Sequence, residues 1–227
     1  MPGSGKTNAA KNAVVAAKAQ RNFTDPDSRI MKTADGSFHY SYNAQAIVDA
    51  DHQVIVATTL TNIGVDVEQV VPMVEKLHAT MGVLPRQILA DAGYCSAANL
   101  DYATSLKAAS DGRTEFFIAT GRVKHGEHVP EVPRGRIPAN VTLRERMARK
   151  LKTKKGRAVY ARRKAIVEPI FGQIHTRQGK FVLLRGLEQA AHEWDLIAAC
   201  HNLMKLHTMQ TKALLAAQRT LTAGPAT

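Results

Sequence analysis

The chain has 227 residues, enough for one sizeable domain and too few for two large ones. Hydrophobic residues make up 44% of it, and no apolar run approaches the roughly 20 residues that cross a bilayer, so a membrane-spanning protein is excluded. The formal net charge of +12 favours an anionic partner, because a charge of this size otherwise costs self-repulsion.

The first half of the chain carries turn signals, β-rich stretches and one helical periodicity. Asp-Pro and Asp-Gly pairs indicate turns, and a short polar stretch between two β-rich runs is typical of a hairpin. Apolar residues at three- and four-residue spacing indicate an amphipathic helix. In chain order we predict a weakly structured segment at 1–22, an ordered loop at 23–37, hairpin strands at 38–48 and 53–60, and a helix at 65–81.

The second half alternates strand and helix and then becomes helical. We predict a strand at 87–90, a helix at 97–109, a strand at 115–119, a mobile loop at 121–138, a basic helix at 143–166, a helix at 170–177, another at 187–207, and a helical tail that frays over 208–227. This alternation predicts a mixed α/β sheet with flanking helices. In the helix at 187–207, Trp194 shares a face with Leu187, Ala191, Ile197 and Leu203, which favours core packing.

The positive charge is concentrated in one stretch. Between Arg134 and Arg185 there are sixteen lysines or arginines and two acids, Glu145 and Glu168. Such a block is typical of a phosphate-backbone contact, because each cation set against a phosphate releases condensed counterions. The alternative is a solvated basic face without a partner.

Three patterns lack the features that would give them a function. GSGKT at 3–7 resembles a phosphate-binding loop, but no strand precedes it and its leading glycine is missing. His125 and His128 have no third metal ligand nearby, so we expect them to be exposed. Cys95 and Cys200 have no CxxC partner and no secretory signal precedes them, which favours buried, reduced thiols in a cytoplasmic protein.

Asp91 is the first candidate functional residue. It follows the predicted strand 87–90 in the sequence Ala-Asp-Ala-Gly-Tyr, and a carboxylate at the end of a strand projects into the crevice where α/β sheets bind ligands. Gly93 allows the chain to turn without covering it. The alternative is a local role, in which Asp91 caps the next helix or forms an Asx-turn.

Glu168 is the second candidate, an acid within the basic block. Pro169 after it suits the first turn of a helix, which would place Glu168 near a helix N-terminus. Two carboxylates from distant parts of a chain can hold divalent metals beside a phosphodiester, although a two-metal site needs at least three acids. The alternative is an exposed ion pair with Arg162 or Arg163.

Several blocks together resemble the second half of bacterial insertion-sequence transposases of the DDE type, which have an RNase H-like catalytic core. The resemblance covers roughly residues 22–207, and the blocks occur in the family's order. They read FTDPDSRIMKTADG, HYSYNAQAIVDADHQVIVA, LADAGYCSAANL, FFIATGRVKHG, RKAIVEPIFGQI and LLRGLEQAAHEWDLIAACHNLMKL.

The resemblance implies a function for the candidate residues. Asp91 would be the second catalytic aspartate and Glu168 the catalytic glutamate, and both would bind Mg²⁺ or Mn²⁺. The partner would be double-stranded DNA, at transposon ends and at the target, and the intact protein would be a possible homodimer. The DNA-contacting residues would be Tyr160, Arg162, Arg163, Lys164, His175, Arg177, Lys180 and Arg185.

Two departures from the family pattern stand out. The family often has a lysine seven residues after the glutamate, and this chain has His175, whose phosphate contact would be weaker and pH-dependent. The first catalytic aspartate belongs upstream of residue 23, and residues 1–22 contain no aspartate, so we expect the core at 23–207 to lack its first strand and the DNA-end-recognition domain. The remaining early acids sit in turns, where local roles are favoured: Asp25, Asp27, Asp35 and Asp49.

Two other functions fit the charge pattern. One is a non-enzymatic, basic nucleic-acid-binding protein, although the aromatic content of 5% is low for stacking on single strands. The other is an RNase H-like nuclease that hydrolyses DNA without strand transfer.

We predict that the chain alone binds DNA weakly and gives no strand transfer, because loss of one ligand of a two-metal site removes ordered metal binding. A strand-transfer assay should show turnover only when an upstream segment carrying the first aspartate is joined to the chain. Turnover by the chain alone would refute this expectation.

Overall fold

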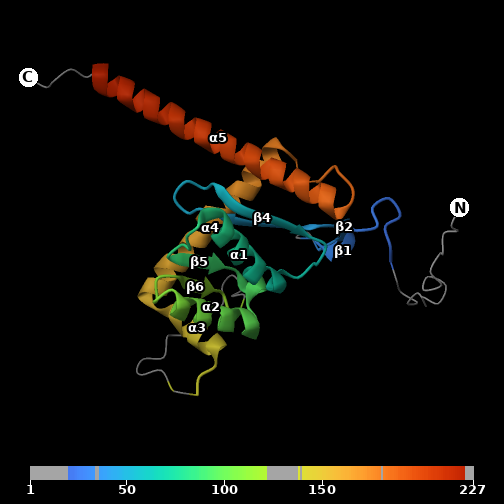
Figure 1. Cartoon of the computed structure of the whole chain (residues 1–227), viewed down its shortest axis with the longest axis vertical. Coiled ribbons are helices and arrows are strands. Elements are labelled where there is room, and N and C mark those ends of the chain that lie inside the picture. The colour runs from blue at the N-terminus through green and yellow to red at the C-terminus, as the bar shows by residue number, and fades with distance from the viewer. Residues whose placement is uncertain (1–19, 34–35, 122–137, 139, 180, 223–227) are drawn as a thin grey trace, which may run out of the picture.

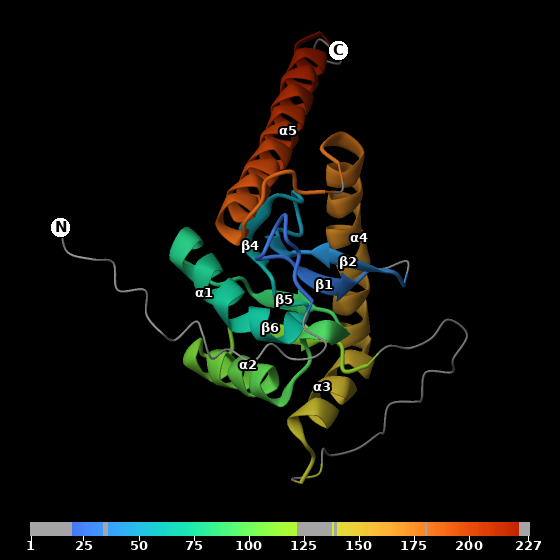
Figure 2. The ribbon, with the colours of Figure 1, turned by 90° about the vertical axis from the view of Figure 1, so that its right-hand side faces the viewer.

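The computed structural model describes residues 20–33, 36–121, 138, 140–179 and 181–222. The strands are β1 (Arg29–Lys32), β2 (Phe38–Ser41), β3 (Asn43–Val48), β4 (Ile55–Thr61), β5 (Gln87–Ala90) and β6 (Glu115–Ile118). The helices are η2 (Asp66–Gln69), α1 (Val70–Met81), η3 (Ala92–Tyr94), α2 (Ala97–Ala109), α3 (Leu143–Lys152), α4 (Lys154–Arg177) and α5 (Leu187–Thr222). The predicted α/β class is confirmed (Figures 1 and 2).

The described strands form three two-stranded sheets. The predicted hairpin is confirmed as the antiparallel pair β3–β4, and β5 and β6 pair in parallel. The single strand predicted over 38–48 is wrong, because the chain breaks at Tyr42 and β2 pairs instead with β1. The segment 23–37, predicted as a loop, therefore contains a strand. The Tyr42 hydroxyl donates to both carboxylate oxygens of Asp25 at 2.8 Å, and this contact lies at the break between β2 and β3.

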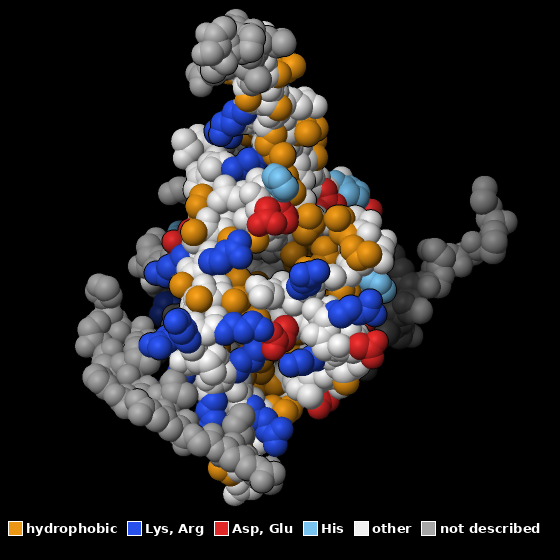
Figure 3. All heavy atoms as spheres, turned by 90° about the vertical axis from the view of Figure 1, so that its left-hand side faces the viewer, with side chains coloured by type: hydrophobic (Ala, Val, Ile, Leu, Met, Phe, Trp, Pro, Cys, Tyr) orange, Lys and Arg blue, Asp and Glu red, His pale blue; other side chains and the backbone are white. Residues whose placement is uncertain are grey.

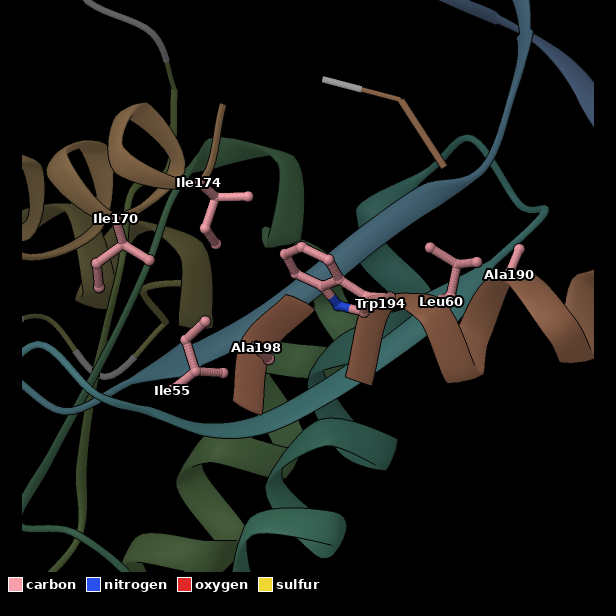
Figure 4. Close-up of a cluster of buried hydrophobic side chains, with 7 residues drawn as sticks. All are labelled: Ile55, Leu60, Ile170, Ile174, Ala190, Trp194 and Ala198. Atoms are coloured by element: carbon pink, nitrogen blue, oxygen red, sulfur yellow. The ribbon is translucent and has the colours of Figure 1, made fainter. Parts of the chain in front are cut away.

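The β3–β4 hairpin is the central layer of the molecule. Figure 1 shows α5 along one side of β4 and α1 on the other. On the α5 side, Trp194 is buried and its ring stacks on Phe171 of α4, with 6.2 Å between ring centroids. The rest of this core comes from three elements and is drawn in Figure 4: Ile55, Leu60, Ile170, Ile174, Ala190 and Ala198. The predicted core role of Trp194 is confirmed.

A second core surrounds the β5–β6 pair. Its central side chain is Phe116 of β6, 2% exposed, and α1 contributes Val70 and Val74 to it. Met73 and Leu77 of α1 form a separate small cluster with Ala57 of β4. Helices α2 and α3 close it with Leu100, Ala103 and Met147. The strand–helix–strand unit β5–α2–β6 was predicted correctly, and it fixes where β5 ends.

The basic helical segment differs from its prediction. The helix expected over 143–166 ends at Lys152, and Thr153 caps the next helix by accepting from Gly156 N at 2.9 Å. That second helix, α4, then runs without interruption through Pro169. Glu168 therefore lies inside a helix, so the predicted position near a helix N-terminus is wrong.

The 36-residue helix α5 begins beside Asp25 and Asp27, and its other end extends beyond the body of the molecule (Figure 2). Gly186 N and Leu187 N, at its start, each donate at 3.1 Å, to Asp25 and Asp27 respectively. Carboxylates are favourable there because they satisfy free N–H groups and oppose the helix dipole. The early Asp-Pro-Asp motif thus has a structural role, but it acts through contacts about 160 positions away and not only through the local role that its turn residues predict.

The predicted burial of two α5 residues is wrong: Leu203 is 66% exposed and Cys200 is exposed. Each lies two positions, or roughly 200° around the helix, from a buried residue, His201 and Ala198 respectively. Cys95, also predicted to be buried, is only partly buried. None of the described helices combines the length and the apolar character needed to cross a membrane.

We predict that Asp25→Ala lowers the free energy of unfolding by about 2 kcal/mol, because it removes a helix-start acceptor and leaves the Tyr42 hydroxyl without its partner. Urea unfolding measures this effect. The exposed Asp101→Ala on α2 is the control and should change stability by less than about 0.5 kcal/mol. Equal effects of the two substitutions would contradict the capping role.

Candidate functional site

Asp91 follows β5 directly, where the parallel β5–β6 pair ends. Its Oδ1 accepts from Gly93 N at 2.8 Å, which is the Asx-turn left open as an alternative. Its Oδ2 lies 4.0 Å from Arg163 Nη1 of α4, and the side chain keeps 45% of its surface exposed. One carboxylate oxygen is thus used locally, while the other faces α4 and solvent.

A second carboxylate, Asp66, lies beside Asp91. A Cβ placed on Gly93 would lie 2.9 Å from Asp66 Oδ2 and 3.1 Å from Asp91 Oδ1. Both oxygens therefore surround the space that a side chain would fill, and only glycine allows this approach. Asp66 was not a sequence candidate, because a Gly-Val-Asp stretch before a helix gives no sign of which strand end it meets.

A polar network on β3 holds Asp66. Asn43 Nδ2 and Gln45 Nε2 each donate to Asp66 Oδ1 at 2.9 Å, and the Tyr94 hydroxyl donates to Gln45 Oε1. Burial, followed by the nearby charges of Asp66 and Asp91, raises the pKa of Tyr94 well above its usual range. Tyr94 therefore stays protonated and links the turn after Asp91 to the central hairpin.

Arg163 and Tyr160 of α4 complete the surroundings of Asp91. The Arg163 side chain is 22% exposed, its guanidinium lies 5.9 Å from the Tyr160 ring centroid, and its buried Nε has no hydrogen-bond partner among the described residues. Burial raises the pKa of the half-buried Tyr160, so its hydroxyl is a donor at neutral pH. Two residues named by the family resemblance thus lie near Asp91.

Glu168 lies on an exposed face of α4. It is five residues after Arg163, which corresponds to roughly 140° around a helix, and no described lysine, arginine or histidine lies within 4.0 Å of it. Its spacing from Arg157, Lys164 and His175 places these exposed side chains on one side of the helix. The pairing of Asp91 with Glu168 around a shared cation stays a prediction.

The other predicted DNA-contacting residues are accessible. Arg177, Arg185 and Lys164 are exposed, and Arg162 makes only an exposed ion pair of 3.7 Å with Asp51. Figure 3 shows lysine and arginine side chains spread over one face, with acidic side chains scattered between them. Lys180, His125, His128 and residues 3–7 lie outside the described residues.

Lys150 has a structural role within the basic block. Its Nζ donates to Phe116 O at 2.6 Å, lies 3.2 Å from Glu115 Oε1 and sits 3.9 Å from the Phe117 ring centroid. Burial opposes ionisation of Glu115, but hydrogen bonds and charges from Lys150 and Lys107 lower its pKa overall. This lysine docks α3 on β6 and does not belong to the accessible positive surface.

The described side chains near Asp91 include the oxygen ligands that a hard divalent cation prefers, but too few of them to hold the ion. Carboxylate oxygens are the ligands that Mg²⁺ prefers, and Asp91 Oδ2 faces the open side. Within the described part of the chain, however, no group of three histidine, cysteine or acidic side chains is arranged to hold a metal ion. Asp91 could therefore supply one ligand of a site that other groups complete.

Comparison with known proteins gives one family. The family model described as a transposase DDE domain matches residues 17–203 of the chain. Searches of curated proteins and of solved structures found no match. The matched segment runs from before β1 into α5, and it includes Asp91, Arg163 and Glu168.

We predict that Gly93→Ala lowers the free energy of unfolding by about 1–3 kcal/mol, because the added methyl group overlaps the Asp66 carboxylate. Gly172→Ala is a matched control, since a Cβ there meets nothing within 4 Å and alanine favours the helix, which should stabilise by about 0.5–1 kcal/mol. Urea unfolding of both variants measures the difference. Opposite signs support the close approach, and similar effects would exclude it.

Proposed function

The chain belongs to the transposase DDE domain family, and we propose that it is the catalytic part of an insertion-sequence transposase that cuts transposon ends and joins them to target DNA. The family implies a nuclease or transposition enzyme whose substrate is DNA. The finer assignment, cleavage followed by strand transfer, is our proposal and rests on the chemistry of the side chains around Asp91.

The observation that carries this proposal is the meeting of Asp91 with Arg163 at the end of β5. A half-exposed carboxylate and a guanidinium 4.0 Å apart offer a cation ligand and a phosphate ligand side by side. A phosphodiester held by a metal ion needs both kinds of contact, because the metal takes oxygen ligands and the arginine binds phosphate oxygens through its planar donors. Arg163 Nε is buried and lacks a partner among the described residues, so the terminal guanidinium nitrogens would make the phosphate contact.

DNA binding in this proposal comes from the exposed side of α4. Arg157 and Lys164 face solvent on the same side as Glu168, and Arg162 is accessible beside them. Contacts of this kind position the DNA backbone and carry no sequence information directly. Sequence recognition at the transposon ends would then come from other contacts.

When bound, the Mg²⁺ or Mn²⁺ ions would activate the attacking oxygen and stabilise the leaving oxygen of an in-line displacement. Asp91 and Glu168 would hold them, together with a third carboxylate. Arg163 would bind the phosphate that accumulates negative charge, and the Tyr160 hydroxyl would donate to a phosphate oxygen beside it. Each of these protein contacts orients the phosphodiester before the reaction.

We predict that Asp91→Asn and Glu168→Gln, in a protein that supplies all three carboxylates, each reduce strand transfer by at least roughly a hundredfold, because each removes a metal ligand. Both variants should keep their DNA affinity. Lys164→Ala should instead weaken DNA binding in fluorescence anisotropy and reduce the slope of log affinity against log salt by about one.

The control for binding is Arg113→Ala, an exposed arginine paired at 3.9 Å with Asp111 outside the basic block. It should leave both binding and strand transfer unchanged. A non-enzymatic nucleic-acid-binding protein would lose nothing on Asp91→Asn, and a nuclease without strand transfer would give only hydrolysed products. Either result would replace the proposed function.

A further inference from the structure

The proline inside α4 leaves one helical carbonyl without its usual donor. Pro169 has no N–H, so the carbonyl of Ala165, four residues earlier, cannot make the hydrogen bond that a helix normally provides. Freed carbonyls of this kind commonly bind a water or another side chain, and the helix often kinks there. Ala165 lies between Arg163 and Glu168, so the conformation at this point sets where both side chains point.

Gln53 supplies the missing donor from the turn of the central hairpin. Its Nε2 donates to Ala165 O at 2.9 Å, across 112 positions in the sequence. Gln53 adopts a φ of 57°, in the left-handed region that residues other than glycine rarely adopt. The turn therefore keeps an uncommon backbone conformation at the residue that reaches α4.

The third partner is α5, which holds Gln53 from the other side. Lys205 Nζ donates to Gln53 Oε1 at 3.0 Å, and His201 Nε2 lies 3.1 Å from the Gln53 carbonyl oxygen. A lysine can only donate and a backbone carbonyl can only accept, so the side-chain amide between Lys205 and Ala165 matches both with one group. A carboxylate at position 53 would suit Lys205 but would repel the Ala165 carbonyl.

We propose that Gln53 is a positioning residue for Glu168. Gln53 replaces the hydrogen bond that Pro169 removes and so holds the middle of α4 in register with the hairpin. The effect of Gln53 on catalysis rests on the proposed function. The two side-chain hydrogen bonds of Gln53 join the β3–β4 turn to α4 and to α5, and their contact on α4, Ala165, lies three residues before Glu168.

The test is a cycle of four proteins: the natural chain, Gln53→Ala, Pro169→Ala and the double variant, studied by hydrogen exchange of the α4 amides. Gln53→Ala should accelerate exchange around residues 165–172 by about five- to tenfold, the value of one net hydrogen bond. Pro169→Ala restores an N–H that can bind Ala165 O, so adding Gln53→Ala to it should accelerate exchange by less than about twofold. Gln53→Glu should resemble Gln53→Ala, and the exposed Gln210→Ala should change nothing in α4.

The cycle is then repeated in a strand-transfer assay of a protein that supplies all three carboxylates. Gln53→Ala should lower the rate of strand transfer while DNA affinity stays unchanged. In the Pro169→Ala background, Gln53→Ala should lower this rate by a smaller factor. An equal effect of Gln53→Ala on exchange in both backgrounds would overturn the proposed hydrogen-bond replacement. Coupling in exchange without any effect on strand transfer would overturn the positioning role, whereas an unchanged rate for Asp91→Asn would overturn the proposed function instead.

Discussion

The buried side chain of Gln45 is the point on which the arrangement of the site depends. It is 4% exposed, and its amide accepts from Tyr94 and donates to Asp66, while its backbone carbonyl accepts from Trp194 Nε1 at 3.0 Å. A buried amide is costly unless its donors and acceptors are satisfied, so these partners are held together as a unit. Through Gln45, the core that binds α5 also fixes the turn that follows Asp91.

The positively charged side chains include both partly buried ones with partners in the protein and exposed ones without described partners. Lys150 and Lys205 use their ammonium groups inside the protein, one against β6 and one against the hairpin turn, and burial lowers the pKa of both. Arg157 and Lys164 lie exposed on α4, and no described partner neutralises them. The basic block that appears uniform in the sequence therefore contains at least one lysine, Lys150, that assembles the fold, and other cations that remain available to an anionic partner. Lys205 has a similar structural role outside this block.

The sequence predicted what depends on local pattern and missed what depends on distant partners. The hairpin turn, the helix over 97–109 and the strand before Asp91 follow from periodicity and turn residues, and all three were correct. Pro169 was interpreted as a helix start because its own effect is local, whereas the donor that makes it tolerable comes from Gln53, 112 positions from Ala165. Asp66 has no motif of its own, and only the folded chain brings it beside Gly93.

The charge balance around Asp91 explains why a cation and a phosphate can share this position. Asp66 and Asp91 bring two negative charges to the space around Gly93, and Arg163 brings one positive charge, 4.0 Å from Asp91. One positive charge does not neutralise two carboxylates. At that distance and exposure the ion pair is worth on the order of 1 kcal/mol or less, so Arg163 can leave Asp91 for another partner. The remaining negative charge favours a cation, and a cation at Asp91 would leave the guanidinium free to turn to a phosphate. Because Arg163 lies on the helix that Gln53 holds at Ala165, the same helix position that sets Glu168 also sets the distance between this guanidinium and Asp91.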